Sequence, residues 1–224
     1  MPENYTYEDN ILRYEFRNDG FTKDLYKEFD HKAIKLDLDS KIDDLLSGKV
    51  VNLTENQRAF HPKYRKNKGF INEFIKSDTD FSLDRESLKD EALISFVDEV
   101  VKSNAENIVS IGIGGSHEGP KLLIESLGHG EVLSSYKHYF ITGSDRIELE
   151  EKLKKLDPKK TVFIVSSKSF TTDETIESLK DAIHWSGDIN KFIAITANKT
   201  EAQKFNLKHI TEFDNEIGGR YSIW

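Results

Sequence analysis

Apolar and polar residues follow a pattern that predicts alternating strands and helices over the last two thirds of the chain. Short β-branched or aromatic runs, typical of buried strands, occur at residues 108–111, 138–142, 161–165, 192–196 and 209–213. The segments between them carry apolar residues at helical spacing and predict helices at about residues 120–127, 146–156, 172–185 and 200–205. Five strands that alternate with helices predict a parallel sheet with helices on both faces.

The first hundred residues show a weaker pattern. Leu12, Tyr14 and Phe16 alternate with charged residues and favour a short strand. Residues 23–46 are largely charged, with scattered apolar positions, and predict one or two surface helices. A clearer helix is expected over residues 84–104, where the apolar side chains share one face and lead directly into the first buried strand.

The first buried strand runs into a glycine-rich loop. Residues 112–119 contain four glycines, and Pro120 is expected in the first turn of the helix that follows. A strand, a glycine loop and a helix together can hold an anion on backbone N–H groups. The dinucleotide fingerprint fails because His117 replaces its third glycine, and the P-loop fails because Pro120 replaces its lysine. The remaining ligand for such a loop is a smaller phosphate, such as a sugar phosphate. The alternative is a turn that is rich in glycine only because it packs tightly.

A second polar loop follows the third predicted strand. Residues 166–172 supply five hydroxyl groups and the ammonium group of Lys168. Such donors suit phosphate oxygens, and ligands of parallel sheets bind at the carboxyl ends of the strands. The alternative is that Thr171 and Glu174 form a capping box for the next helix. Capping needs one hydroxyl rather than five, so the phosphate interpretation is favoured.

A third candidate lies at residues 218–224, where two glycines precede Arg220. Its guanidinium can hold a phosphate or stabilise a developing oxyanion, although a structural arginine explains the pattern equally well.

Composition narrows the function classes. The 224 residues carry 32 basic and 40 acidic groups, a net charge of −8, which argues against general binding to nucleic acid. The absence of cysteine excludes disulfides, thiolate metal sites and cysteine nucleophiles. No metal site is predicted, because the seven histidines are scattered, and His129 and His138 are expected to be surface or hydrogen-bonded core residues. No signal peptide or membrane span is expected, so we predict a cytoplasmic protein that does not bind membranes.

Four segments, in order, resemble motifs of the phosphoglucose isomerase family: residues 52–65, 111–116, 167–175 and 218–224. The resemblance covers about residue 50 to the last residue. It implies a three-layer α-β-α sugar-isomerase (SIS) domain with a five-stranded parallel sheet at residues 84–224. A mainly helical N-terminal segment at residues 1–83 would precede it, and the second SIS domain would be absent from this chain.

The resemblance also implies roles for individual residues. Gly115 and Ser116 would line the sugar-phosphate site, and Gly219 would lie beside the reacting carbons, where Arg220 would stabilise the enediolate. The serine–lysine loop would hold the phosphate through Ser167, Lys168, Ser169, Phe170, Thr171 and Thr172. The sequence departs from the family pattern at Ser169, usually a threonine, at His117-Glu118 and at His61-Pro62.

The implied reaction interconverts glucose 6-phosphate and fructose 6-phosphate, a step of glycolysis and gluconeogenesis, in a homodimer without metal or organic cofactor. In the family, the general base and a histidine from the partner subunit come from the part downstream of this motif. Glu118 is not assigned as the base, because its carboxylate would face the phosphate. We therefore expect this N-terminal portion to keep the phosphate site but to be inactive alone. A stand-alone, non-catalytic sugar-phosphate-binding module is the alternative.

Overall fold

The computed structural model describes residues 5–8, 13–16, 22–54, 56–59, 90–127, 136–143 and 145–216. The chain divides into two compact units, Met1–Pro62 and Lys63–Trp224. The domain boundary predicted near residue 83 falls outside the described residues and stays a prediction. Among the residues described, no helix is both long and apolar enough to cross a membrane.

The first unit contains a hairpin and two helices. Strands β1 (Tyr5–Glu8) and β2 (Arg13–Phe16) pair in antiparallel fashion, and helices α1 (Lys23–Lys35) and α2 (Leu38–Ser47) follow. The hydroxyl of Thr22 caps α1 by accepting from the N–H of Leu25, and a left-handed glycine ends α2. The predicted strand is confirmed, and the one or two helices predicted over residues 23–46 are two.

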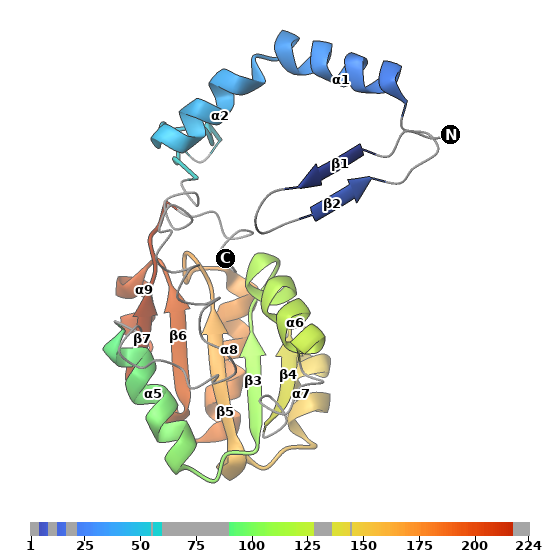
Figure 1. The fold of residues 1–224 in the computed structure, drawn as a ribbon. Helices are drawn as coiled ribbons and strands as arrows, with labels where there is room; N and C mark the ends of the chain where they lie inside the picture. The colour runs from blue at the N-terminus through green and yellow to red at the C-terminus, as the bar shows by residue number, and fades with distance from the viewer. Residues whose placement is uncertain are drawn as a thin grey trace. The chain divides into compact units, whose positions relative to one another are not determined.

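The second unit is a parallel sheet between two layers of helices (Figure 1). Its strands are β3 (Asn107–Ile111), β4 (Lys137–Ile141), β5 (Thr161–Ser166), β6 (Phe192–Thr196) and β7 (His209–Glu212). Its helices are α5 (Glu91–Lys102), α6 (Gly115–Leu127), α7 (Arg146–Leu153), α8 (Asp173–Ser186) and α9 (Lys199–Gln203). All neighbouring strands are parallel, in the order β4-β3-β5-β6-β7. The predicted five-stranded α/β architecture is confirmed.

Two apolar clusters lie on opposite faces of this sheet. One joins α7, α8 and α9 to the sheet and includes Phe163 and Phe192, whose rings stack with centroids 4.4 Å apart. The other packs Phe96 and Val100 of α5 against Val162 of β5. Because both faces are covered, the central strands β5 and β6 carry apolar residues on both faces, which explains why they appeared as apolar runs in the sequence.

Helix α5 is tied to the edge strand β7 by a charged contact. The carboxylate of Glu99 contacts both the ammonium of Lys208 and Nε2 of His209, the latter at 3.1 Å. The hydrogen bond from Lys208 is the main cause that lowers the pKa of Glu99. His209 is buried, and its ring lies edge-on to that of Phe96. Edge strand β7 is thereby covered and attached to the sheet's helical layer.

One predicted helix start is wrong, and the capping box considered as an alternative for another helix does not form. Helix α6 begins at Gly115, not near Pro120, which lies inside it without an N–H for the carbonyl four residues earlier. Helix α8 has Thr172 as its N-cap, and the side chain of Thr172 makes no capping hydrogen bond. The capping box of Thr171 and Glu174 therefore does not form.

The expectation for His138 is also wrong. Both ring nitrogens are buried, and within the described part of the chain neither has a hydrogen-bond partner. Burial disfavours the charged imidazolium and lowers the pKa of His138. The neighbouring strand places Ile108 beside it in the register, so the ring occupies an apolar position of the sheet. His129 lies outside the described residues.

Gly112 is packed between α6 and the end of β5. A Cβ atom at this position would lie 2.8 Å from the carbonyl oxygen of Ser116 and 3.0 Å from that of Ser166. Both are backbone atoms that cannot rotate away. Only glycine allows the helix to start this close to the neighbouring strand.

We predict that Gly112→Ala lowers the free energy of unfolding by about 1–3 kcal/mol, as overpacking of a tight site does. Urea denaturation of the 224-residue chain measures it. The matched control is Gly114→Asn, because Gly114 has φ +58° and open space around its Cβ position, and asparagine tolerates that conformation. An equal decrease in the free energy of unfolding in both variants would contradict the packing explanation.

We predict that His138→Leu raises the free energy of unfolding by about 1 kcal/mol at pH 7.5, because it removes unsatisfied buried nitrogens. The folded-state pKa lies below the ordinary 6.5, so the unfolded chain binds a proton that the fold excludes, and stability falls as the pH drops below 6.5. Denaturation measured at pH 7.5 and at pH 5.5 should show that the free energy of unfolding falls less between these two values in His138→Leu than in the unmodified chain. His184→Gln, which removes an exposed imidazole from α8, is the control variant, and a pH response of His138→Leu equal to that of the unmodified chain would contradict the prediction.

Candidate functional site

The strand order reverses between β3 and β5. Helix α6 leads from β3 to β4 on one side, whereas α8 leads from β5 to β6 on the other side. These two helices cover opposite faces of the sheet (Figure 1). Open parallel sheets bind ligands in the crevice outside the carboxyl ends of the strands at such a switch point. The glycine loop and the serine–lysine loop follow these two strands.

The structure brings these two loops together. Strands β3 and β5 are paired in register, with Ile111 opposite Val165, so both loops begin at the same level of the sheet. The tight packing of Gly112 against both Ser116 and Ser166 shows that the loops also touch at their start. The sequence placed both loops at strand ends, and the register makes them neighbours.

The glycine loop offers fewer backbone donors than expected. The N–H of Ser116 donates to the carbonyl of Ile113, and those of His117 and Glu118 donate to the carbonyl of Gly114. The hydroxyl of Ser116, in contrast, makes no hydrogen bond to the described residues. The loop can therefore offer a ligand this hydroxyl, while its amides hold the turn.

Glu118 does not stand alone beside the glycine loop. Its carboxylate lies 2.9 Å from Nδ1 of His117, and the buried imidazole lies edge-on to the ring of Phe140 with centroids 5.8 Å apart. Part of the negative charge that was expected to face the phosphate is engaged by this contact.

The serine–lysine loop uses some of its hydroxyls to hold itself. The Oγ of Ser167 accepts from the N–H of Phe170 at 3.1 Å and lies 3.5 Å from Oγ1 of Thr172. The Oγ of Ser169 accepts from the N–H of Thr171 at 3.2 Å. Thr171 and Ser169 are exposed, and Lys168 and Thr172 are partly exposed, so four of the predicted side chains remain accessible at this edge.

Phe170 has a different role from its neighbours. Its side chain is 1% exposed and packs edge-on against Phe205, with centroids 5.9 Å apart. Its backbone is left-handed, with φ 53°, which is costly for a residue with a large side chain. The aromatic contact helps to hold this conformation, so the ring anchors the loop in the core instead of contacting a ligand.

The remaining predicted residues lie wholly or partly outside the described part of the chain. Gly219 and Arg220 belong to residues 217–224, for which no structure is described. Of residues 52–65, the described part contains an isolated bridge between Asn52 and Gln57. Their assignments stay predictions.

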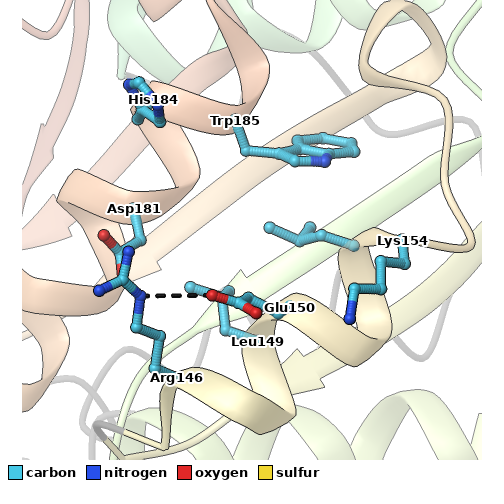
Figure 2. A pocket seen from close by; sticks show the side chains of 8 residues that line it. Arg146, Leu149, Glu150, Lys154, Asp181, His184 and Trp185 are labelled. Carbon is cyan, nitrogen blue, oxygen red and sulfur yellow. Dashed lines mark ion pairs between the residues drawn. The ribbon is translucent and has the colours of Figure 1, made fainter.

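A separate pocket of about 400 Å³ lies between α7 and α8 (Figure 2). Arg146 at its rim pairs with Glu150 at 3.4 Å and with Asp181 at 3.5 Å. The full lining is Arg146, Leu149, Glu150, Leu153, Lys154, Asp181, His184 and Trp185. This lining includes none of the predicted site residues. Its two carboxylates balance the charges of Arg146 and Lys154, so the pocket favours neither an anionic nor a cationic ligand. The paired loops that follow β3 and β5 are the candidate site.

Comparisons with known proteins agree with the motif resemblance. A family model described as phosphoglucose isomerase matches residues 15–224. The glucose-6-phosphate isomerase of Wigglesworthia glossinidia brevipalpis is 32% identical over 96% of this chain and 42% of its own length. That of Kluyveromyces lactis is 29% identical over 97% of this chain and 42% of its own length. The chain thus spans less than half the length of these curated relatives.

Solved structures share the fold of the second unit. A hypothetical protein from Thermus thermophilus has a TM-score of 0.51 at 25% identity, over 59% of this chain and 34% of its own. A glucose-6-phosphate isomerase from Chlamydia trachomatis has a TM-score of 0.50 at 24% identity, over 59% of this chain and 27% of its own. These structural similarities agree with the observed α/β sheet. The family model matches 210 of the 224 residues, from residue 15 to residue 224. The chain belongs to the phosphoglucose isomerase family.

Proposed function

We propose that this chain supplies the phosphate-binding domain of an enzyme that interconverts glucose 6-phosphate and fructose 6-phosphate. The observation that carries the proposal is the meeting of two polar loops at the β3–β5 switch point. Ser116 would contribute a hydroxyl from one side, and Lys168 and Thr172 would contribute an ammonium and a hydroxyl from the other. A phosphate dianion needs such convergent donors, because the net charge of −8 gives no general attraction.

The chemistry at the sugar carbons would need groups beyond this loop pair. Arg220 would stabilise the enediolate oxyanion, by resemblance to the family, and Gly219 would lie beside it. The resemblance places the general base and a second-subunit histidine in the part of the family's sequence that follows, and this chain corresponds to about 42% of its relatives. We therefore propose that the 224-residue chain binds sugar phosphate but does not isomerise it, and that the active assembly is a cytoplasmic homodimer.

Apolar side chains that are exposed in the first unit support the proposal that another polypeptide packs against it. Helices α1 and α2 and the turn between them expose Phe29, Ile34, Leu36, Leu38 and Ile42. So many large apolar side chains exposed on two short helices favour an interaction surface there. A second copy of the chain, or the remaining half of a full-length enzyme, would cover it.

We predict that Lys168→Ala weakens the binding of fructose 6-phosphate by about 10- to 100-fold, as expected for a lost hydrogen bond to a charged group. Isothermal titration calorimetry on the 224-residue chain measures the Kd. Lys180→Ala, which removes an exposed lysine from α8, the helix that follows this loop, is the control and should bind as before. Unphosphorylated fructose that binds as tightly as the phosphate ester would refute the phosphate site.

We predict that the purified chain converts fructose 6-phosphate at least about 100-fold more slowly than a full-length glucose-6-phosphate isomerase, since general acid–base catalysis contributes about 10²–10⁴ in rate. An assay coupled to glucose-6-phosphate dehydrogenase measures the turnover. Turnover near the rate of the full-length enzyme would show that the chain carries its own base, and would overturn this part of the proposal.

A further inference from the structure

The serine–lysine loop is attached along one side to the end of β6. The N–H of Ser167 donates to the carbonyl of Ile195 at 3.1 Å, which extends the pairing of β5 and β6 past the end of the strand. One residue further, the carbonyl of Lys168 accepts from the N–H of Ala197 at 3.0 Å. The loop therefore leaves the sheet only at Ser169, immediately before the left-handed Phe170.

Thr196 stands at the centre of this attachment. It is fully buried, and its Oγ1 donates to the same carbonyl of Lys168 at 3.1 Å. That Oγ1 also accepts from the N–H of Asn198 at 3.0 Å, where the chain turns into α9. Its own carbonyl accepts from the N–H of Phe213, at the end of β7. One hydroxyl thus joins the serine–lysine loop, β6 and the start of α9.

We propose that Thr196 is a positioning residue that holds the serine–lysine loop in its anion-binding shape, an inference that rests on the proposed phosphate site. Its hydroxyl is the second donor on the Lys168 carbonyl and sets the direction in which the chain departs toward Ser169. The contact of Phe170 with Phe205, which follows α9, is the second point of attachment. Residues 196–205 thereby act as the support of the loop, although none of them was singled out from the sequence.

Without the hydroxyl, the carbonyl of Lys168 would lose one of its two donors and the N–H of Asn198 would lose its acceptor. Both groups lie next to the point where the loop must adopt the unfavourable left-handed φ at Phe170. The loop would relax toward commoner backbone conformations, and the donors of Lys168 and Thr172 would no longer converge. The loss would appear in anion binding more than in the stability of the sheet.

The chain supplies a matched control in Thr161, at the opposite end of the neighbouring strand. Thr161 is also buried, and its Oγ1 also donates to a backbone carbonyl, that of Asp157, at 2.8 Å. Thr161→Val and Thr196→Val remove equivalent hydrogen bonds at the amino and carboxyl edges of the sheet. Thr196→Ser keeps the hydroxyl and should rescue both measurements below.

The test uses the 224-residue chain and two measurements on each variant. Amide hydrogen exchange of Phe170 and Ala197 reports the loop without any ligand, and calorimetry with fructose 6-phosphate reports binding. We expect Thr196→Val to speed up both amides and to raise the Kd at least about tenfold. Thr161→Val should lower stability comparably and leave loop exchange and Kd unchanged. Thr196→Ala, which places no methyl group near the Lys168 carbonyl, serves if the valine variant does not fold.

Three outcomes decide between the explanations. Loop amides that exchange as in the unmodified chain would overturn the inference, whatever the binding result. Equal effects of Thr196→Val and Thr161→Val on Kd would also overturn it, because they would reduce Thr196 to a general structural role. An unmodified chain that does not bind fructose 6-phosphate, while the loop loosens only in the Thr196 variants, would refute the proposed function and leave the positioning role standing.

Discussion

The site depends on the in-register parallel pairing of β3 with β5. This pairing starts two loops at the same level of the sheet, and the missing side chain at Gly112 lets them approach each other. Parallel pairing alone does not make this a switch point. The chain moves away from β3 and from β5 in opposite directions, so that α6 and α8 cover opposite faces, the arrangement at which open parallel sheets bind ligands.

Some polar groups of these two loops make hydrogen bonds within the loops, and others stay accessible at the carboxyl edge of the sheet. Ser167 and Ser169 accept from loop amides, and the glycine-loop amides close their own turn. Lys168 and Thr172 are partly exposed, and the hydroxyl of Ser116 makes no hydrogen bond to the described residues. A loop that is hydrogen-bonded internally before a ligand arrives loses less entropy on binding, which would help a small set of donors to hold the proposed anion on an acidic protein.

The strand predictions succeeded because a parallel sheet with both faces covered leaves a strong local pattern of β-branched and aromatic residues. Helix starts were less predictable. Pro120 suggested a first-turn position, but the packing of Gly112 against Ser116 and Ser166 starts α6 five residues earlier, at Gly115. The Thr171–Glu174 spacing fits a capping box, but the hydrogen bonds of the serine–lysine loop make Thr172 the N-cap instead.

The sequence by itself determined the alternation of strands and helices, the two polar loops at strand ends and the family, because each depends on neighbouring residues in the chain. Only the tertiary structure decided which loops meet, since strand order and register depend on contacts between distant segments. It also showed that Phe170 is turned into the core and that the ring nitrogens of His138 are buried without hydrogen-bond partners among the described residues. It further showed that the hydroxyl of Thr196 donates to the carbonyl of Lys168, 28 residues before it in the chain. Hydrogen bonds across that separation leave no periodic signal in the sequence, whereas the amphipathic pattern of each element does.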